Sequence, residues 1–190
     1  MKEMNRREFL TLSGAAVVAL SLAGCGGPSA PPAPAAPTGK EAELLAAINK
    51  VWKEKFNTSK VDHEQLILNQ EAQGAIKIQG GIFENAQESV HTLTTEDMKK
   101  LVEIQEWKIS LEKKYDLGGA AGISEPTGEE GNMEISLTYA YSCEDAVVQK
   151  FVDKILDYSL SRKAEYISIY CPVVQSTTYM IATVFWNKTA

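Results

Sequence analysis

The sequence has few of the residues that build metal clusters and disulfide frameworks. Among its 190 residues there are three cysteines and two histidines. Three thiols are too few for a four-thiolate zinc or iron–sulfur site, and they exclude a fold held together mainly by disulfides. Neither histidine lies in a His-Glu-x-x-His pattern, which excludes the zinc proteases that carry this motif.

Basic residues are also in the minority. The chain has 19 lysines and arginines against 25 acidic residues, which gives a net charge of −6. A nucleic-acid-binding surface needs an excess of positive charge to neutralise phosphates, so we expect no nucleic-acid partner. The hydrophobic fraction of 44% is ordinary for a folded protein and excludes disorder along the whole chain.

Long hydrophobic runs are missing, and a short one near the N-terminus has the flanks of an export signal. An arginine pair followed by Phe-Leu lies within residues 5–10, and the apolar run at 15–20 is too short to span a bilayer. This arrangement resembles the bacterial twin-arginine signal. The sequence Leu-Ala-Gly-Cys that ends at Cys25 resembles a lipobox, in which the cysteine is acylated and becomes the first mature residue. We therefore predict a signal peptide over residues 1–24.

A proline-rich stretch follows the lipobox. Residues 26–39 hold five of the seven prolines, a composition that favours extended polyproline II. We predict a lipid-anchored tether over residues 25–39, about 40 Å long, and one globular domain over residues 40–190. Acyl chains on Cys25 would hold the protein stably on a bilayer, so the expected location is extracytoplasmic, on a bacterial membrane.

In the remaining chain, hydrophobic periodicity predicts mostly helices first and strands last. The expected elements are helices over about 40–56 and 62–78, a helix from Thr94 or Thr95, a loop over 118–131, a strand over 134–141, a helix capped by Ser142 and Asp145, and a hairpin of strands 165–173 and 177–186. The second helix is expected to end at Gly80-Gly81. This order predicts the α+β class.

Several short stretches, taken in this order, are similar to the CAP domain of the cysteine-rich secretory, antigen 5 and pathogenesis-related proteins. They are Glu-Leu-Leu-Ala-Ala-Ile-Asn-Lys-Val at 43–51, Ser-Cys-Glu-Asp-Ala-Val at 142–147, Ile-Ser-Ile at 167–169 and the closing strand at 179–186. The resemblance implies an α-β-α sandwich with N-terminal helices and a C-terminal antiparallel sheet.

The resemblance also implies a central cleft, where the family has two histidines and two acidic residues that can take up a divalent metal. His91 matches the first histidine, Glu134 matches one acidic position, and Glu144 or Asp145 matches the other. The second histidine is absent, because Leu-Asp-Tyr-Ser at 156–159 replaces the Gly-His-Arg turn. A zinc site of this type would lack a ligand, so the comparison favours a degenerate, metal-free cleft.

Two cysteines remain besides Cys25. In an extracytoplasmic protein, two such thiols form a disulfide more often than not, so we expect a bridge between Cys143 and Cys171. The alternative is that Cys143, at a helix start, is a nucleophile with a lowered pKa. That role requires a nearby base, which the sequence does not place.

Together these features favour a binding module over an enzyme, with an envelope component, a lipid or a partner protein as its ligand. A metal-dependent hydrolase or protease that uses His91, Glu134 and Glu144 is the first alternative. A structural envelope lipoprotein is the second. No cofactor is expected, and a divalent metal is the one candidate considered.

Overall fold

The computed structural model describes residues 39–129 and 132–188, so the predicted signal peptide, Cys25 and nearly all of the predicted tether lie outside the described residues. In chain order the elements are α2 (Lys40–Asn57), β1 (Ile67–Leu68), α3 (Gln73–Ala86), β2 (Val90–Thr92), α4 (Thr95–Leu111), β3 (Tyr115–Ala121), β4 (Glu134–Ser136), α5 (Asp145–Leu156), the 3-10 helix η1 (Ser159–Lys163), β5 (Tyr166–Tyr170), β6 (Val173–Val174), β7 (Thr177–Thr178) and β8 (Ile181–Asn187).

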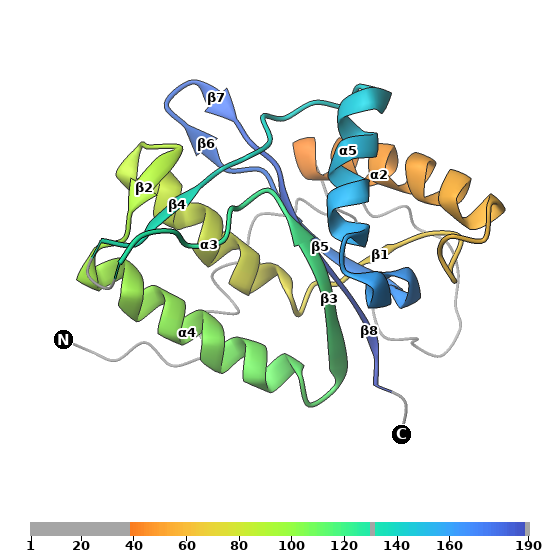
Figure 1. The fold of residues 1–190 in the computed structure, drawn as a ribbon, viewed down its shortest axis with the longest axis horizontal. Helices are drawn as coiled ribbons and strands as arrows, with labels where there is room; N and C mark the ends of the chain where they lie inside the picture. The colour runs from red at the N-terminus through yellow and green to blue at the C-terminus, as the bar shows by residue number, and fades with distance from the viewer. Residues whose placement is uncertain (1–38, 130–131, 189–190) are drawn as a thin grey trace, which may run out of the picture. The chain divides into compact units, whose positions relative to one another are not determined.

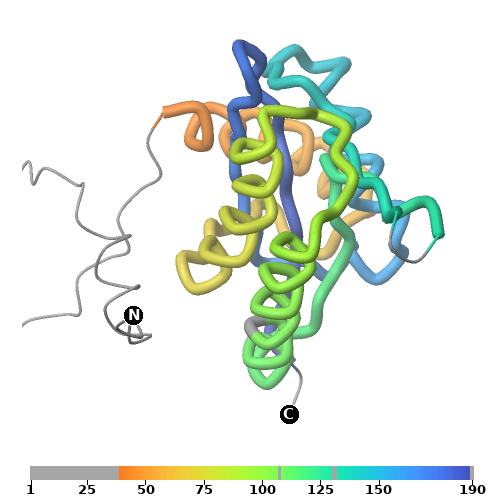
Figure 2. The backbone as a smooth tube through the Cα atoms, turned by 90° about the vertical axis from the view of Figure 1, so that its left-hand side faces the viewer, coloured from red at the N-terminus to blue at the C-terminus, as the bar shows by residue number. Residues whose placement is uncertain are grey.

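A four-stranded sheet in the order β1-β5-β8-β3 forms the middle layer. Helices α2 and α5 cover one face, and α3 and α4 cover the other (Figure 1). Figure 2 turns the molecule so that α3 and α4 face the viewer. The α+β class is as predicted. The sheet is mixed and not wholly antiparallel, because β1 runs parallel to β5 while β8 is antiparallel to both of its neighbours.

Side chains along the central strands alternate between the two faces of the sheet and contribute to a hydrophobic core on each face. Ile167, Ile169 and Val184 point to one face and pack with residues of α2 and α5. Ile181 and Phe185 point to the other face and pack beneath α3 and α4. Successive side chains of a strand point to opposite faces, so a strand covered on both sides needs apolar residues at nearly every position.

The helix predicted over 62–78 is wrong at both ends. Strand β1 occupies part of that range, and α3 begins only at Gln73. Helix α3 runs through Gly80-Gly81 and ends where Gln87 adopts a left-handed backbone with φ of 56°. A Cβ atom on Gly80 would overlap the ring of Tyr170, so this glycine lets α3 approach the sheet closely and does not end the helix.

Other boundaries also shift from the predicted ones. Strand β3 reaches Ala121, so the loop predicted over 118–131 begins later than expected. The strand predicted over 134–141 is reduced to β4, with isolated bridges beyond it. Helix α5 has Glu144 at its N-cap without a side-chain cap, so the predicted capping box of Ser142 and Asp145 is wrong.

The predicted helices at 40–56 and from Thr95 are confirmed as α2 and α4. The pairing of the last two long strands is confirmed as well, because β5 and β8 are antiparallel neighbours from Tyr166 opposite Phe185 to Tyr170 opposite Ile181. A second, smaller hairpin of β6 and β7 makes the connection between them.

Ser168, in the middle of β5, is 2% exposed, and its hydroxyl has no hydrogen-bond partner among the described residues. A buried hydroxyl without a partner costs about 1–3 kcal/mol. We expect Ser168→Ala to raise the free energy of unfolding by about 1 kcal/mol, as measured by urea unfolding. The same change at exposed Ser176 should stay within about 0.5 kcal/mol of the wild type. A destabilised Ser168→Ala protein would contradict this expectation.

Candidate functional site

The residues predicted to form a cleft do not converge. His91 lies on β2 and Glu134 on β4, which pair as a two-stranded antiparallel ribbon. His91 is opposite Ile135, whereas Glu134 is opposite Thr92, so the side chains of His91 and Glu134 point to opposite faces of the ribbon. His91 is buried, and Glu134 is exposed.

Glu144 lies on a different element, at the N-cap of α5, where it is exposed. Its hydrogen bonds in the described structure use its backbone, with Ser142 Oγ accepting from its N–H at 3.1 Å. Within residues 39–129 and 132–188, no group of three or more His, Cys, Asp or Glu side chains is arranged to hold a metal ion.

His91 belongs instead to a local cluster with carboxylates. Its Nε2 lies 2.9 Å from Asp97 Oδ2, and its Nδ1 lies 3.3 Å from Glu88 Oε2. The same Asp97 oxygen accepts from the backbone N–H and the hydroxyl of Thr94, at 3.0 and 2.6 Å. Asp97 N in turn donates to Thr94 Oγ1, which completes a reciprocal capping box at the start of α4.

The hydrogen bonds in this cluster favour the charged forms of His91 and Asp97 and shift both pKa values. Burial alone would lower the pKa of His91, but hydrogen bonds to Asp97 and Glu88 outweigh it and raise that pKa. Burial would raise the pKa of Asp97, but hydrogen bonds from Thr94 and His91 overcome it and lower the pKa to about 2. The His91 ring is held at both nitrogens and ties β2 to α4, so neither nitrogen is free to act as a base or a metal ligand.

We expect the stability of the protein to fall at alkaline pH because of His91. Its pKa is raised in the folded state, so its stabilisation is complete below the unfolded value of about 6.5 and is lost as the pH rises through the folded value. Urea unfolding from about pH 6 to about pH 9 should show this loss. His91→Gln should remove it, and His63→Gln at an exposed site should retain it. Identical pH profiles for the wild type and His91→Gln would refute the assignment.

The remaining cysteines are free thiols in the structure, with Cys143 exposed and Cys171 buried. Burial raises the pKa of the Cys171 thiol to about 12. Cys143 Sγ lies 3.4 Å from the hydroxyl of Tyr141, which donates to Glu43 at 2.7 Å and is not a base. The disulfide between the two thiols stays a prediction, which peptide mapping without reductant would test.

A hollow of about 450 Å³ lies at the edge of the sheet formed by β3. It is lined by Lys108 of α4, by Glu112 just after α4, by residues 115–119 of β3, by Tyr158 after α5 and by Lys188 after β8. The sequence does not predict this site, because its residues come from four separate segments. The local signal is Gly118-Gly119, which falls at the start of the predicted loop.

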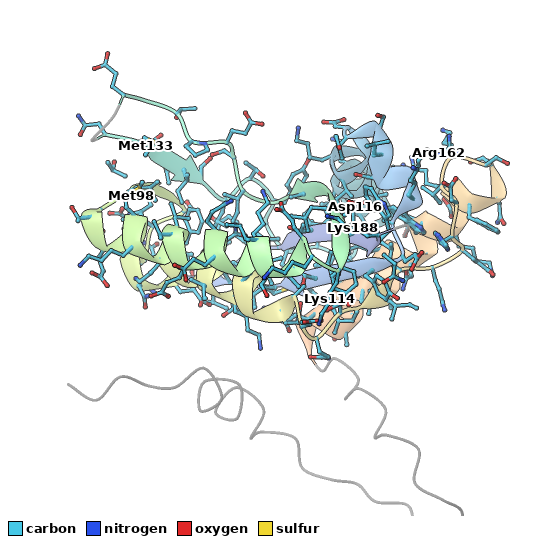
Figure 3. All side chains as sticks on the ribbon, turned by 90° about the horizontal axis from the view of Figure 1, so that it is seen from below. Met98, Lys114, Asp116, Met133, Arg162 and Lys188 are labelled. Atoms are coloured by element: carbon cyan, nitrogen blue, oxygen red, sulfur yellow. The ribbon has the colours of Figure 1, made fainter. Side chains whose placement is uncertain are left out.

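The hollow extends around the edge of β3 and is not confined to one face of the sheet. Asp116 is opposite Trp186, on the face that α2 and α5 cover. Tyr115 and Leu117 pack with Phe185 on the other face. Figure 3 shows Asp116 and Lys188 near the C-terminal end of α4, whose N-terminal end is marked by Met98. A hollow lined from both faces must include the unpaired edge of the strand.

The charged side chains around the hollow lack ion-pair partners. Two lysines and two acidic residues line it, and none of the four forms an ion pair in the described part of the chain: Lys108, Lys188, Glu112 and Asp116. Neighbouring Lys114, by contrast, contacts Glu71 at 2.6 Å. The hollow therefore presents charges of both signs to solvent.

The described residues contain no helix that is long and apolar enough to cross a membrane. No protein-family model matches the chain, and no curated protein or solved structure matches it.

Proposed function

We propose that the protein is a lipid-anchored bacterial surface protein whose folded part is a non-catalytic binding module. The observation that carries the binding role is the hollow at the edge of β3, with its unpaired charges. The hollow has a volume of about 450 Å³ and is open and lined in part by charged residues, so it differs from the enclosed apolar pockets that hold small molecules. His91 is not among the residues that line it. The expected ligand is an envelope component or a partner protein.

The geometry gives less support to a hydrolase. Both ring nitrogens of His91 contact carboxylates, while Glu134 points to the opposite face of its ribbon and Glu144 lies on α5. An acid–base or metal site needs such groups within hydrogen-bonding or coordination distance of one reacting atom. The proposed module accordingly uses no cofactor. The layered α-β-α arrangement supports, as a proposal, a degenerate domain of the CAP type.

The anchor is proposed from the sequence. The arginine pair at Arg6 and Arg7 would direct export, and acylated Cys25 would hold the mature chain on the membrane. The proline-rich stretch would then separate the domain from the bilayer by up to about 40 Å.

Cys25→Ala tests the anchor. We expect the wild type in the membrane fraction even after a high-salt wash, because each buried methylene of an acyl chain contributes about 0.8 kcal/mol. The variant should move to the soluble fraction. Cys143→Ala, a change at an exposed free thiol, is the matched control and should stay with the membrane. Membrane association that survives Cys25→Ala would rule out the lipid anchor.

A further inference from the structure

We infer that the free edge of β3 binds an extended peptide segment of a partner protein, and that this segment carries charges of both signs. The inference rests on the proposed binding function and specifies the class of partner. It starts from the strand order, in which β3 is the last strand on its side of the sheet. An edge strand presents backbone N–H and C=O groups that can pair with an added strand.

The backbone of β3 lines the hollow along most of the strand. Five consecutive residues, 115–119, line the hollow, and the last two are Gly118 and Gly119. A Cβ on Gly118 would lie 2.9 Å from Val184 Cγ2, and one on Gly119 would overlap the carbonyl oxygen of Ile155. The glycines are therefore required by packing within the fold.

The same packing holds the edge in place before any partner arrives. Gly119 N donates to Ser161 Oγ at 2.7 Å, at the point where the register with β8 shifts between Leu117 and Ala120. Strand β3 is therefore fixed by β8 on one side and by η1 at the bulge. A preordered edge lowers the entropy cost of binding a flexible segment.

Charge indicates the character of the partner. Lys108 and Glu112 stand on the α4 side of the hollow, while Asp116 and Lys188 stand on the α5 side. A segment with only acidic or only basic side chains would meet two repelling charges. A segment that carries both signs can satisfy all four groups, which supplies specificity.

Apolar side chains continue this surface along α4. Met98, Val102 and Ile109 recur at helical spacing and are 38%, 58% and 51% exposed. Ile109 is three residues from Glu112, which lines the hollow, so the stripe borders it. Alternate side chains of an extended segment point to opposite sides, so the side that faces α4 would carry apolar residues.

Lys108 of α4 and Tyr158 after α5 are among the residues that line the hollow beside the strand edge. A segment added to this edge as a further strand would lie about 4.8 Å from β3. A second copy of this chain is the competing occupant, and the test below distinguishes it.

The test uses a displayed library of random linear peptides, selected against the full chain carrying Cys25→Ala so that it stays soluble. We expect enriched peptides that carry both signs of charge and bind with one-to-one stoichiometry. Their binding should slow amide hydrogen exchange in residues 116–119. The double variant Lys108→Glu with Lys188→Glu should weaken the Kd about tenfold, because each exposed charge contact is worth roughly threefold.

A matched control separates the local effect from net charge. Lys77→Glu with Lys150→Glu makes the same charge change at exposed sites outside the hollow, and it should leave the Kd unchanged. No enrichment, or enriched peptides that bind both double variants equally well, would overturn the inference. Sedimentation that shows self-association through β3 would overturn it in favour of a second copy. If envelope material protects this edge while peptides do not bind, the inference fails and the proposed binding function stands.

Discussion

Replacing Asp97 with alanine is expected to lower the free energy of unfolding by about 3 kcal/mol. One oxygen of this side chain accepts hydrogen bonds from His91, from Thr94 N and from Thr94 Oγ1. The half of the capping box that Asp97 supplies, the acceptor for Thr94 N, is lost at a cost of about 1 kcal/mol. The buried imidazole left without its carboxylate costs about 1–3 kcal/mol more.

The control for this change is Glu96→Ala in the same helical turn. Glu96 is exposed and contacts Lys99 at 3.3 Å, so its removal should cost no more than about 0.5 kcal/mol. Chemical unfolding near neutral pH measures both variants. Equal losses for Asp97→Ala and Glu96→Ala would show that the cluster around His91 does not hold α4 in place.

The free energy of unfolding is also expected to fall at acid pH because of the Asp97 carboxylate. Its pKa is about 2 in the folded protein and about 3.8 as a free side chain. Its contribution is therefore complete above the unfolded value and is lost as the pH falls toward the folded one. Together with His91, whose contribution is lost as the pH rises, this places the strongest stabilisation by the cluster between about pH 4 and about pH 6.5.

Gly119→Ala is expected to cost about 3 kcal/mol, for a steric reason. The added Cβ would overlap the carbonyl oxygen of Ile155 and lie 2.9 Å from Ser161 Oγ. Ile155 O is a backbone atom at the end of α5, so relieving the overlap requires β3 and α5 to separate. The same change would disturb the hydrogen bond from Gly119 N to Ser161 Oγ.

Gly81→Ala provides the comparison for this prediction. Gly81 lies inside α3, and a Cβ there would have nothing within 4 Å. Alanine is favoured over glycine in a helix, so this variant should gain up to about 1 kcal/mol. If Gly119→Ala were as stable as the wild type in the same urea titration, the close contact of β3 with α5 would be wrong.

The elements that the sequence predicts well are those with a local signal. Helix α2 has Leu44, Ile48 and Trp52 at helical spacing, and all three are fully buried as that spacing requires. The separation of three residues between Thr94 and Asp97 indicates only a partial capping box, and the structure shows a complete one. In both cases the physical cause lies within a few residues of chain.

The failures have causes that are distant in sequence. Glycine disfavours helix, so Gly80 suggests the end of a helix. It lies inside α3 because the ring of Tyr170, ninety positions away, occupies the space where a side chain would be. Strand β1 has two residues, too few for any periodicity. The pairing of His91 with Glu134 was inferred from a family pattern, and the strand register of β2 and β4 separates their side chains.

The hollow at β3 could not be predicted from the sequence. Its existence depends on β3 being the edge strand, which follows from the pairing of β8 with both β5 and β3. Lys108 and Lys188 are eighty positions apart, and no motif connects them. Composition and motifs predict a binding protein on a membrane, and the hollow is where we propose that binding occurs.

Hydrogen exchange with envelope material tests the central claim most directly. The full chain carrying Cys25→Ala would be exchanged alone and then with envelope fractions from the cells that make it. A binding module that uses the β3 hollow predicts slower exchange in residues 108–119, with the amides around His91 unchanged. Exchange that is unaltered throughout, or slowed around His91 and not at β3, would contradict the account.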